Sequence, residues 1–393
     1  MPTTVADRQI VGGDWKFYLS PQTAKGAINA SPVFEPVRRT SGRFKKSISY
    51  TQSSEVSLDF NASKQVQDTR ELMAEISTEA TKQSIALLLS AIHGTEQVIS
   101  LTGTTFAATA TGFTDSANGF TNLAVGDFIF VTGFANAALN ITYRITAKAN
   151  NGTISTYPAP AATAAAGASV TIKCSKTYNA NTPTYYAGQN RVIDGASVGG
   201  INYDTPYDGI INQQTVEVGE TGIITSTVSM MFERDSAAST AISGQTDSAL
   251  ATDAPLSAVQ NVSNWYLNNL VALCEVKSTS ITINNNYQTD QAAGCTPRMS
   301  RGQFEVTLEG ASRSSIATST KIRDLYYAGT RIAYGVEFEH GGGQKTVIHL
   351  PQVVITEWDM EDGQNAIGSN TYSASAEKSD TLGYTVAIFR NWS

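Results

Sequence analysis

Three runs near the start of the chain decide its fold: Phe44-Lys-Lys-Ser-Ile-Ser-Tyr50, Glu55-Val-Ser-Leu-Asp-Phe60 and Glu71-Leu-Met-Ala-Glu-Ile76. Apolar and polar residues largely alternate in all three. A period of two is typical of strands that are buried on one face only. In the third run, Glu71 and Glu75 share the polar face. The segment therefore predicts strands with one face in a core and the other in solvent.

The period changes to that of a helix directly after these strands. Apolar residues recur at i, i+3, i+4 and i+7, and they are Ile85, Leu88, Leu89 and Ile92. This spacing predicts a short helix that packs one stripe onto the sheet. Thr81 and Ser84 offer hydroxyls for the N-terminal cap, and Gly94 is expected to provide a left-handed C-terminal cap.

The same order of patterns recurs between about residue 276 and the C-terminus. Alternating runs, a helical run that Gly329 closes, and further alternating runs follow one another at 280–283, 304–309, 322–326, 336–339, 347–355 and 384–388. The sequence therefore predicts a mainly β protein with two tandem units. Each unit is expected to be a β-sandwich or barrel with a short flanking helix.

Composition narrows the classes of function. Only 16% of the 393 residues are charged, and the net charge is −7, whereas about a quarter of residues are charged in a typical globular protein. A net negative chain argues against binding a nucleic-acid backbone through a basic surface. No signal peptide and no apolar run of membrane-spanning length are visible, so we expect a protein made in a cytoplasm.

Shifts in composition divide the chain. Residues 96–176 are rich in Ala, Thr, Gly and Asn, and a hairpin is predicted around the turn Asn150-Asn-Gly152. This range is expected to form a small β domain, barrel-like or immunoglobulin-like, inserted into the first unit. The predicted division is an N-terminal arm at 1–42, a first unit at 43–95 and 177–235, the insert, a linker at 236–262, and a second unit at 263–393. The aromatic residues of the arm are expected to dock on a neighbouring subunit, with a frayed terminus as the alternative.

One catalytic pattern matches. Gly195-Ala-Ser-Val-Gly199 fits the nucleophile motif of serine hydrolases, and His340-Gly-Gly-Gly343 is similar to the oxyanion loop of lipases. A nucleophile elbow needs a helix directly after the serine, but Ser197 is followed by glycines and a turn. The glycine loop also follows the serine in the chain, whereas in lipases it precedes it. We therefore interpret both segments as loops.

Metal and disulfide chemistry have equally weak support. His340 and His349 flank the glycine loop and could face each other across a hairpin, but a third ligand is not evident. Asp204 and Asp208 lie in a segment, 203–209, that is predicted to be a turn and lack the spaced carboxylates of a calcium loop. His93 is expected to be structural. The three cysteines show no C-x-x-C spacing. The sequence predicts no enzyme, no cofactor and no metal site.

The arrangement resembles the tail tube proteins of bacteriophages with long, non-contractile tails. The resemblance covers residues from about 40 to the C-terminus. It is carried by Arg39-Thr-Ser-Gly42 with Ser54-Glu55, by the Val125-Gly-Asp-Phe128 turn of the insert, by Ser280-Ile-Thr-Ile-Asn-Asn-Asn286 and by Leu350-Pro-Gln-Val-Val-Ile355. Thr81-Lys-Gln-Ser84 stands where the family usually has an aromatic residue, a glycine and an aspartate before its first helix.

The resemblance implies a virion protein that closes into rings, which stack into a tube for DNA ejection. Single-unit members form hexameric rings, so two units per chain imply a trimer, with a hexamer as the alternative. Implied partners are further copies of the chain, the tape measure protein, the tail terminator and distal tail proteins, and double-stranded DNA that passes without specific binding. Assembly is expected in the host bacterial cytoplasm, with no membrane involved.

Carboxylates on alternating strands are the candidates for the wall of the channel, because an acidic wall repels phosphates. They are Glu55, Asp59, Glu71, Glu75, Glu305, Glu309, Glu337 and Glu339. Ordinary solvated strand faces would show the same alternation. Two other functional classes stay open at this point: a β-rich decoration or receptor-binding protein, and a tail terminator or contractile-tail tube protein.

Overall fold

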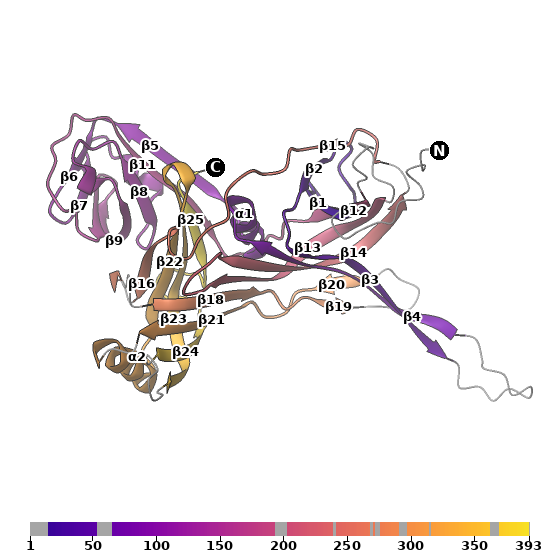
Figure 1. The fold of residues 1–393 in the computed structure, drawn as a ribbon. Helices are drawn as coiled ribbons and strands as arrows, with labels where there is room; N and C mark the ends of the chain where they lie inside the picture. The colour runs from indigo at the N-terminus through magenta and orange to yellow at the C-terminus, as the bar shows by residue number, and fades with distance from the viewer. Residues whose placement is uncertain are drawn as a thin grey trace, which may run out of the picture.

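The computed structural model describes residues 15–52, 65–192, 203–238, 241–267, 270–271, 276–290, 297–313, 316–361 and 369–392. Figure 1 shows a long sheet with projecting hairpins at one end and a cluster of short strands at the other. The predicted mainly β architecture is confirmed. The predicted strand 55–60 and Ser197 lie outside the described residues.

The first set of elements forms a connected ladder. Its members are β1 (Trp15–Pro21), β3 (Ser41–Gln52), β4 (Gln65–Glu79), α1 (Lys82–Ala91), β12 (Tyr186–Val192), β13 (Tyr203–Val218) and β14 (Thr225–Ala238). The antiparallel pairs run β3–β4, β4–β14, β14–β13, β13–β12 and β12–β1. Helix α1 contacts β13. Strand β2 (Val33–Pro36) extends the ladder beyond β1.

A second set repeats these pairings. Its members are β16 (Val262–Leu267), β18 (Val276–Asn284), β21 (Glu305–Arg313), α2 (Ile316–Ala328), β22 (Ile332–His340), β23 (Gln344–Glu361) and β24 (Ser369–Ala376). Here the pairs run β18–β21, β21–β24, β24–β23, β23–β22 and β22–β16, and α2 contacts β23. Short strands β17 (Leu270–Val271), β19 (Gln288–Asp290) and β20 (Arg298–Ser300) complete this region.

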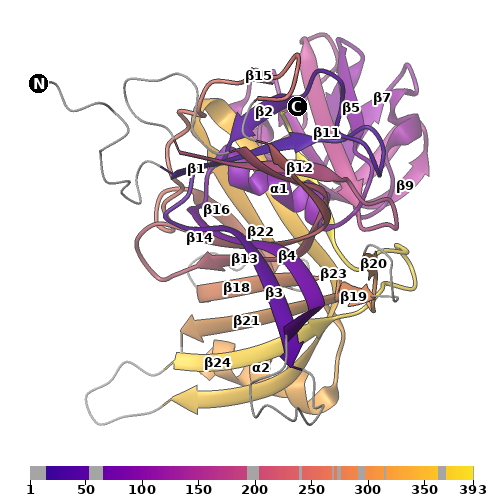
Figure 2. The same ribbon diagram turned by 90° about the vertical axis from the view of Figure 1, so that its right-hand side faces the viewer.

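One antiparallel pair, β13 with β18, joins the two sets into a single sheet. Eight described strands of this larger sheet lie in the order β3, β4, β14, β13, β18, β21, β24 and β23, and we call them the eight-stranded sheet. Figure 2 shows β13, β18, β21 and β24 side by side. One row of this sheet faces the core, and its buried members are Thr78, Ser226, Val216, Ile281, Leu308, Ala374 and Ile355.

Residues 97–178 form a separate cluster of strands. These are β5 (Gln97–Gly103), β6 (Phe106–Ala108), β7 (Gly112–Asp115), β8 (Phe128–Thr132), β9 (Thr142–Asn150), β10 (Thr153–Tyr157) and β11 (Val170–Tyr178). The predicted hairpin is the β9–β10 pair. Strand β11 also pairs with β25 (Ala387–Arg390), and Phe128 lies 5.3 Å from Phe389 between ring centroids. The core of this cluster is therefore continuous with the second set.

Only the N-terminal end of α1 follows the prediction. Thr81 and Ser84 form a reciprocal capping box, as expected. The left-handed cap was wrongly placed at Gly94, because His93 has a φ of 53° instead. Gly94 is required for another reason: a Cβ there would lie 2.1 Å from the carbonyl oxygen of Tyr178. Helix α2 ends as predicted, with Gly329 at a φ of 58°.

Two other expectations are corrected. Residues 203–209 form the start of β13 instead of a turn, because Tyr203 to Tyr207 and Gly209 pair with β14 in one register. Asp208, at a φ of 57°, has no ladder partner on either side, and the register with β12 shifts between Asp204 and Gly209. Residues 15–36 do not form an arm for a neighbouring subunit. Phe17, Tyr18 and Phe34 are buried within the chain, because β1 adds to β12 and β2 adds to β1.

Replacing Gly94 tests this close approach. Gly94→Ala should lower the free energy of unfolding by about 1–3 kcal/mol, the usual cost of overpacking, because the new Cβ meets backbone that cannot move freely. Thermal unfolding of the unassembled chain measures the loss. Gly341→Ala is the control, since nothing lies within 4 Å of its Cβ position. Equal melting temperatures for both variants would contradict the packing described for Gly94.

Candidate functional site

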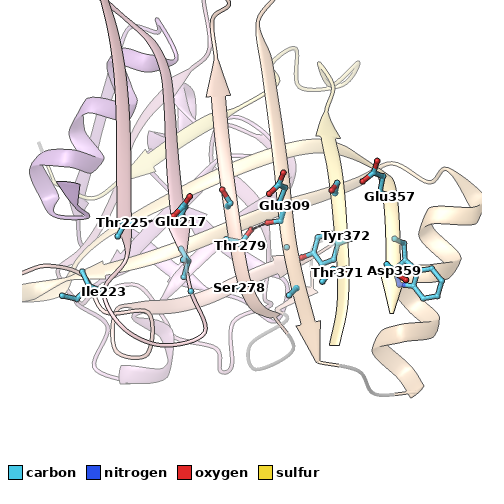
Figure 3. A pocket seen from close by; sticks show the side chains of 17 residues that line it. Glu217, Ile223, Thr225, Ser278, Thr279, Glu309, Glu357, Asp359, Thr371 and Tyr372 are labelled. Carbon is cyan, nitrogen blue, oxygen red and sulfur yellow. Dashed lines mark hydrogen bonds between the residues drawn. The ribbon is translucent and has the colours of Figure 1, made fainter. Parts of the chain in front are cut away.

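A row of carboxylates crosses the face of the sheet opposite the core. Successive ladder partners across seven strands are Glu79, Thr225, Glu217, Ser280, Glu309, Ser373 and Glu357, and we call this set the carboxylate row. Residues directly opposite in a ladder share one face of the sheet. Figure 3 shows the carboxylates of Glu217, Glu309 and Glu357 on the same side of the strands. All members are exposed or half-buried.

A second row runs parallel to the first, two residues further along each strand. Its members are Ser41, Ser77, Thr227, Thr215, Thr282, Thr307 and Ser375, and we call it the hydroxyl row. Thr215 and Thr282, on the two strands that join the sets, share a hydrogen bond of 2.9 Å between their hydroxyl oxygens. The two rows lie roughly 7 Å apart. Together they form a wettable, acidic surface without a lysine, an arginine or an aromatic ring in either row.

Basic side chains lie at the border of this surface. Arg43 and Lys45 are exposed on β3, the outermost strand on one side, and Arg313 is exposed at the end of β21. A trough of about 890 Å³ covers the ends of the strands, and its lining includes Glu217 and Glu309. Within the two rows the charged side chains are all carboxylates.

The spacing of the carboxylates limits their chemistry. In the carboxylate row they occupy every second strand, so their backbones are roughly 9.6 Å apart. Side chains that project in parallel from such backbones are spread out and do not converge on one proton or metal ion. Among the described residues, no cluster of three or more His, Cys, Asp or Glu side chains could hold a metal. The arrangement suits repulsion of an anion better than binding or catalysis.

The predicted wall residues fall into three groups. Glu71, Glu75, Glu305 and Glu309 are exposed on this face, and Glu309 belongs to the carboxylate row. Glu55 and Asp59 lie outside the described residues. Glu339 is partly exposed and lies 3.8 Å from the Lys345 ammonium. Sequence reasoning missed Glu79, Glu217 and Glu357, because the strands that carry them were not aligned with one another. The available signal was the position of Glu217 between Val216 and Val218.

Glu337 is fully buried, so the prediction that its carboxylate lies on the wall of the channel is wrong. Its carboxylate accepts hydrogen bonds from the Lys345 ammonium at 2.8 Å, the Tyr266 hydroxyl at 2.6 Å and the Thr142 hydroxyl at 3.0 Å. Thr142 belongs to β9, so the strands at 97–178 cover the face of β22 that was expected to meet solvent. Burial raises the pKa of Glu337, but Lys345 and the hydroxyl donors outweigh it and lower the pKa.

The histidines do not form a site. His349 lies opposite Gly335 and packs against Phe128 and Tyr384, so it does not face His340. Burial lowers the pKa of His93 and of His340 to about 4, which keeps both neutral. The glycine loop is the expected hairpin turn between β22 and β23. Asp208 accepts a hydrogen bond from the Gly26 amide at 2.7 Å and therefore has a structural role.

The Glu337 cluster gives a testable prediction. Lys345→Met should lower the free energy of unfolding by about 3–5 kcal/mol, because it leaves a buried carboxylate without its cation. Adding Glu337→Gln should recover most of the loss, and chemical denaturation at pH 7 measures both. The folded-state pKa of Glu337 lies below the unfolded value. The contribution of its charge is therefore present above the unfolded pKa and disappears as pH falls through the folded pKa.

Additive effects of the two substitutions would contradict this account of the cluster. The double variant would then be the least stable of the three, and Glu337 would not depend on Lys345.

Comparison with known protein families identifies the family of the chain. The model of one protein family, described as phage tail tube protein, matches residues 12–386. A search of curated proteins found no match. In the described part of the chain, neither helix is long and apolar enough to cross a membrane. The family is structural and is not a known enzyme family. The match spans nearly the whole chain, which therefore belongs to the phage tail tube proteins, structural components of the virion tail.

Proposed function

We propose that this chain closes into rings that stack into the tube of a long, non-contractile tail, and that the carboxylate and hydroxyl rows line its channel. The observation that carries the proposal is the composition of the two rows. Fourteen consecutive ladder positions contain four carboxylates, ten hydroxyls and no cation. Such a face suits a conduit through which DNA passes during ejection.

The physical argument concerns adhesion. Proteins hold duplex DNA mainly through Lys and Arg contacts to phosphates, and they hold single strands by stacking bases on aromatic rings. Both kinds of contact are missing from the two rows. Carboxylates repel the phosphates, and hydroxyls keep the wall hydrated. DNA moving along these two rows would meet neither kind of contact, which favours rapid ejection.

The matching pairings of the two sets support two tail-tube units per chain. Three chains would then supply six units, and their sheets would bring twenty-four strands to one barrel. With strands about 4.8 Å apart and tilted by about 40°, such a barrel measures roughly 48 Å between opposite backbones. Six chains would double this diameter. A trimeric ring leaves room for a hydrated duplex without a large empty margin, so we favour the trimer.

The proposal also assigns a position in the assembly to the inserted strands. Residues 97–178 cover β22 from the side away from the carboxylate row and would decorate the outside of the tube as an inserted β domain. Expected partners are the tape measure protein inside the tube, and the tail terminator and distal tail proteins at its ends. Assembly in the host cytoplasm completes the proposal.

Charge reversal in the carboxylate row tests the proposed channel. Tubes of Glu217→Lys/Glu309→Lys should bind short duplex DNA, whereas wild-type tubes should not. Binding should weaken steeply as salt increases, because phosphate contacts release counterions. Fluorescence anisotropy of labelled duplex measures both effects. Negative-stain microscopy of the same samples confirms that tubes have formed.

The matched control is Asp324→Lys/Asp380→Lys, which makes the same change in net charge outside the two rows. Asp324 lies on α2 and Asp380 in the loop after β24, and both are exposed. If the control tubes bind DNA as well as the row variant, the position of the charge is irrelevant and the proposed wall is wrong.

A further inference from the structure

We propose that neighbouring copies join edge to edge, with β23 of one chain pairing antiparallel with β3 of the next, in the register that places Asp359 opposite Lys45. The proposal rests on the ring-forming function above and names the surface that closes the ring. Its partner is a second copy of this chain. Four observations carry it: the two free edges, an internal template, the charges on each edge and an exposed apolar side chain.

Both edges of the eight-stranded sheet are free among the described residues. Beyond Val353, β23 pairs with β24 on one side only, and β3 pairs only with β4. A long unpaired hydrogen-bonding edge is a template for another strand. At the β3 edge, the Asn190 amide makes a long contact of 3.5 Å with the Phe44 carbonyl oxygen. A partner strand can replace that contact.

The joint between β13 and β18 shows how such edges fit. In it, Gln213 to Val218 pair with Asn284 to Thr279 without a register shift. Strand β13 belongs to the first set and has the place that β23 has in the second. Strand β18 in turn has the place of β3. The chain therefore already contains one copy of the joint, and a ring needs the same joint between molecules.

The register can be transferred residue by residue. Strand β4 ends three residues before α1, and β21 ends three residues before α2, so Ser77 and Ala311 are equivalent. Ser77 pairs with Thr227, which pairs in turn with Thr215. In the same way, Ala311 pairs with Thr371, which pairs with Asp359. On the other side, Ser77 pairs with Ser41 and Ala311 pairs with Ser278. Four residues further on, Lys45 is thus equivalent to Thr282.

The internal pair Thr215–Thr282 therefore predicts the pair Asp359–Lys45 between molecules. In the same register Glu357 falls opposite Ser47, and the position of Glu361 falls opposite Arg43. Glu357 and Asp359 are exposed on one edge, and Arg43 and Lys45 are exposed on the other. None of these four makes an ion pair with another residue that the structure describes. The edge of β23 is acidic and that of β3 is basic, as a joint between different edges requires.

Charge also excludes the wrong joints. Two β23 edges would oppose carboxylates, and two β3 edges would oppose cations, and like charges directly opposite each other destabilise a strand pair. Only the head-to-tail joint matches opposite charges, and such a joint closes into a ring when its rotation allows. On the core side of the same joint, Met360 is 45% exposed and falls opposite Phe44. The next copy would cover this side chain.

Cysteine cross-linking tests the register on the full chain. Tubes of Asp359→Cys/Lys45→Cys should form covalent dimers and trimers when oxidised or treated with a short bis-thiol reagent. Directly opposite residues have Cβ atoms about 4.5–5.5 Å apart, within reach of such a bridge. The control is Met360→Cys/Lys45→Cys, because adjacent residues on a strand point to opposite faces. Wild-type tubes control for Cys174, Cys274 and Cys295.

A non-reducing gel and microscopy of the same samples separate the outcomes. If tubes form but the control pair cross-links and the Asp359/Lys45 pair does not, the register is wrong while the proposed function stands. If the wild-type chain forms no rings or tubes under any condition that supports folding, both proposals are wrong. Covalent trimers as the largest cross-linked species would support the joint and three copies per ring together.

Charge exchange gives a second readout if the cysteine variants assemble poorly. Lys45→Asp and Asp359→Lys should each reduce tube yield at low salt at least tenfold, and the double variant should restore it. Asp380→Lys, with the same charge change as Asp359→Lys, should leave the yield unchanged. Failure of the double variant to assemble better than either single variant would contradict the pairing of these two side chains.

Discussion

The backbone ladder between β13 and β18 is the constraint on which the rest of the structure depends. A shift of one residue in this joint would turn every side chain of the second set to the opposite face of the sheet. In the observed register, Val216 meets Ile281 on the core side, and Glu217 meets Ser280 on the other. The apolar core and the carboxylate row are therefore two consequences of one alignment.

A sheet with one face in solvent needs its apolar face to be covered by other elements of the chain. Helices α1 and α2 provide part of it through contacts with β13 and β23. The strands at 97–178 cover a further part, and there the buried Glu337 accepts hydrogen bonds from both sides of the junction. The cover allows the opposite face to consist of hydroxyls and carboxylates, which fits the proposed wall of a DNA channel.

Local patterns in the sequence predicted local structure well. The alternation at 71–76, the capping box of α1, the glycine that ends α2 and the β9–β10 hairpin all follow from neighbouring residues, and the structure confirms them. Sequence reasoning failed where the outcome depends on distant partners. Glu337 alternates with apolar residues like Glu309, but distant partners that include Thr142 and Tyr266 bury it. The sequence predicts an arm at 1–42, and only the pairing of β1 with the distant strand β12 places residues 15–21 in the sheet.

The wall candidates show the same limit. Glu71, Glu75, Glu305 and Glu309 could be selected from alternation alone, whereas Glu79, Glu217 and Glu357 join Glu309 in one row only through pairings between strands that lie far apart in the sequence. No pattern within a single strand contains this alignment. The joint between molecules is still harder to predict from the sequence, because its register is inferred from the internal joint between β13 and β18.

A cryo-electron microscopy map of the assembled tube tests the central claim most directly. Our account predicts three copies per ring, with Glu217, Glu309 and Glu357 facing the channel. Strand β23 of each copy should be hydrogen-bonded to β3 of the next. A map in which these three carboxylates lie on the outer wall, or in which a different face of the sheet lines the channel, would contradict it.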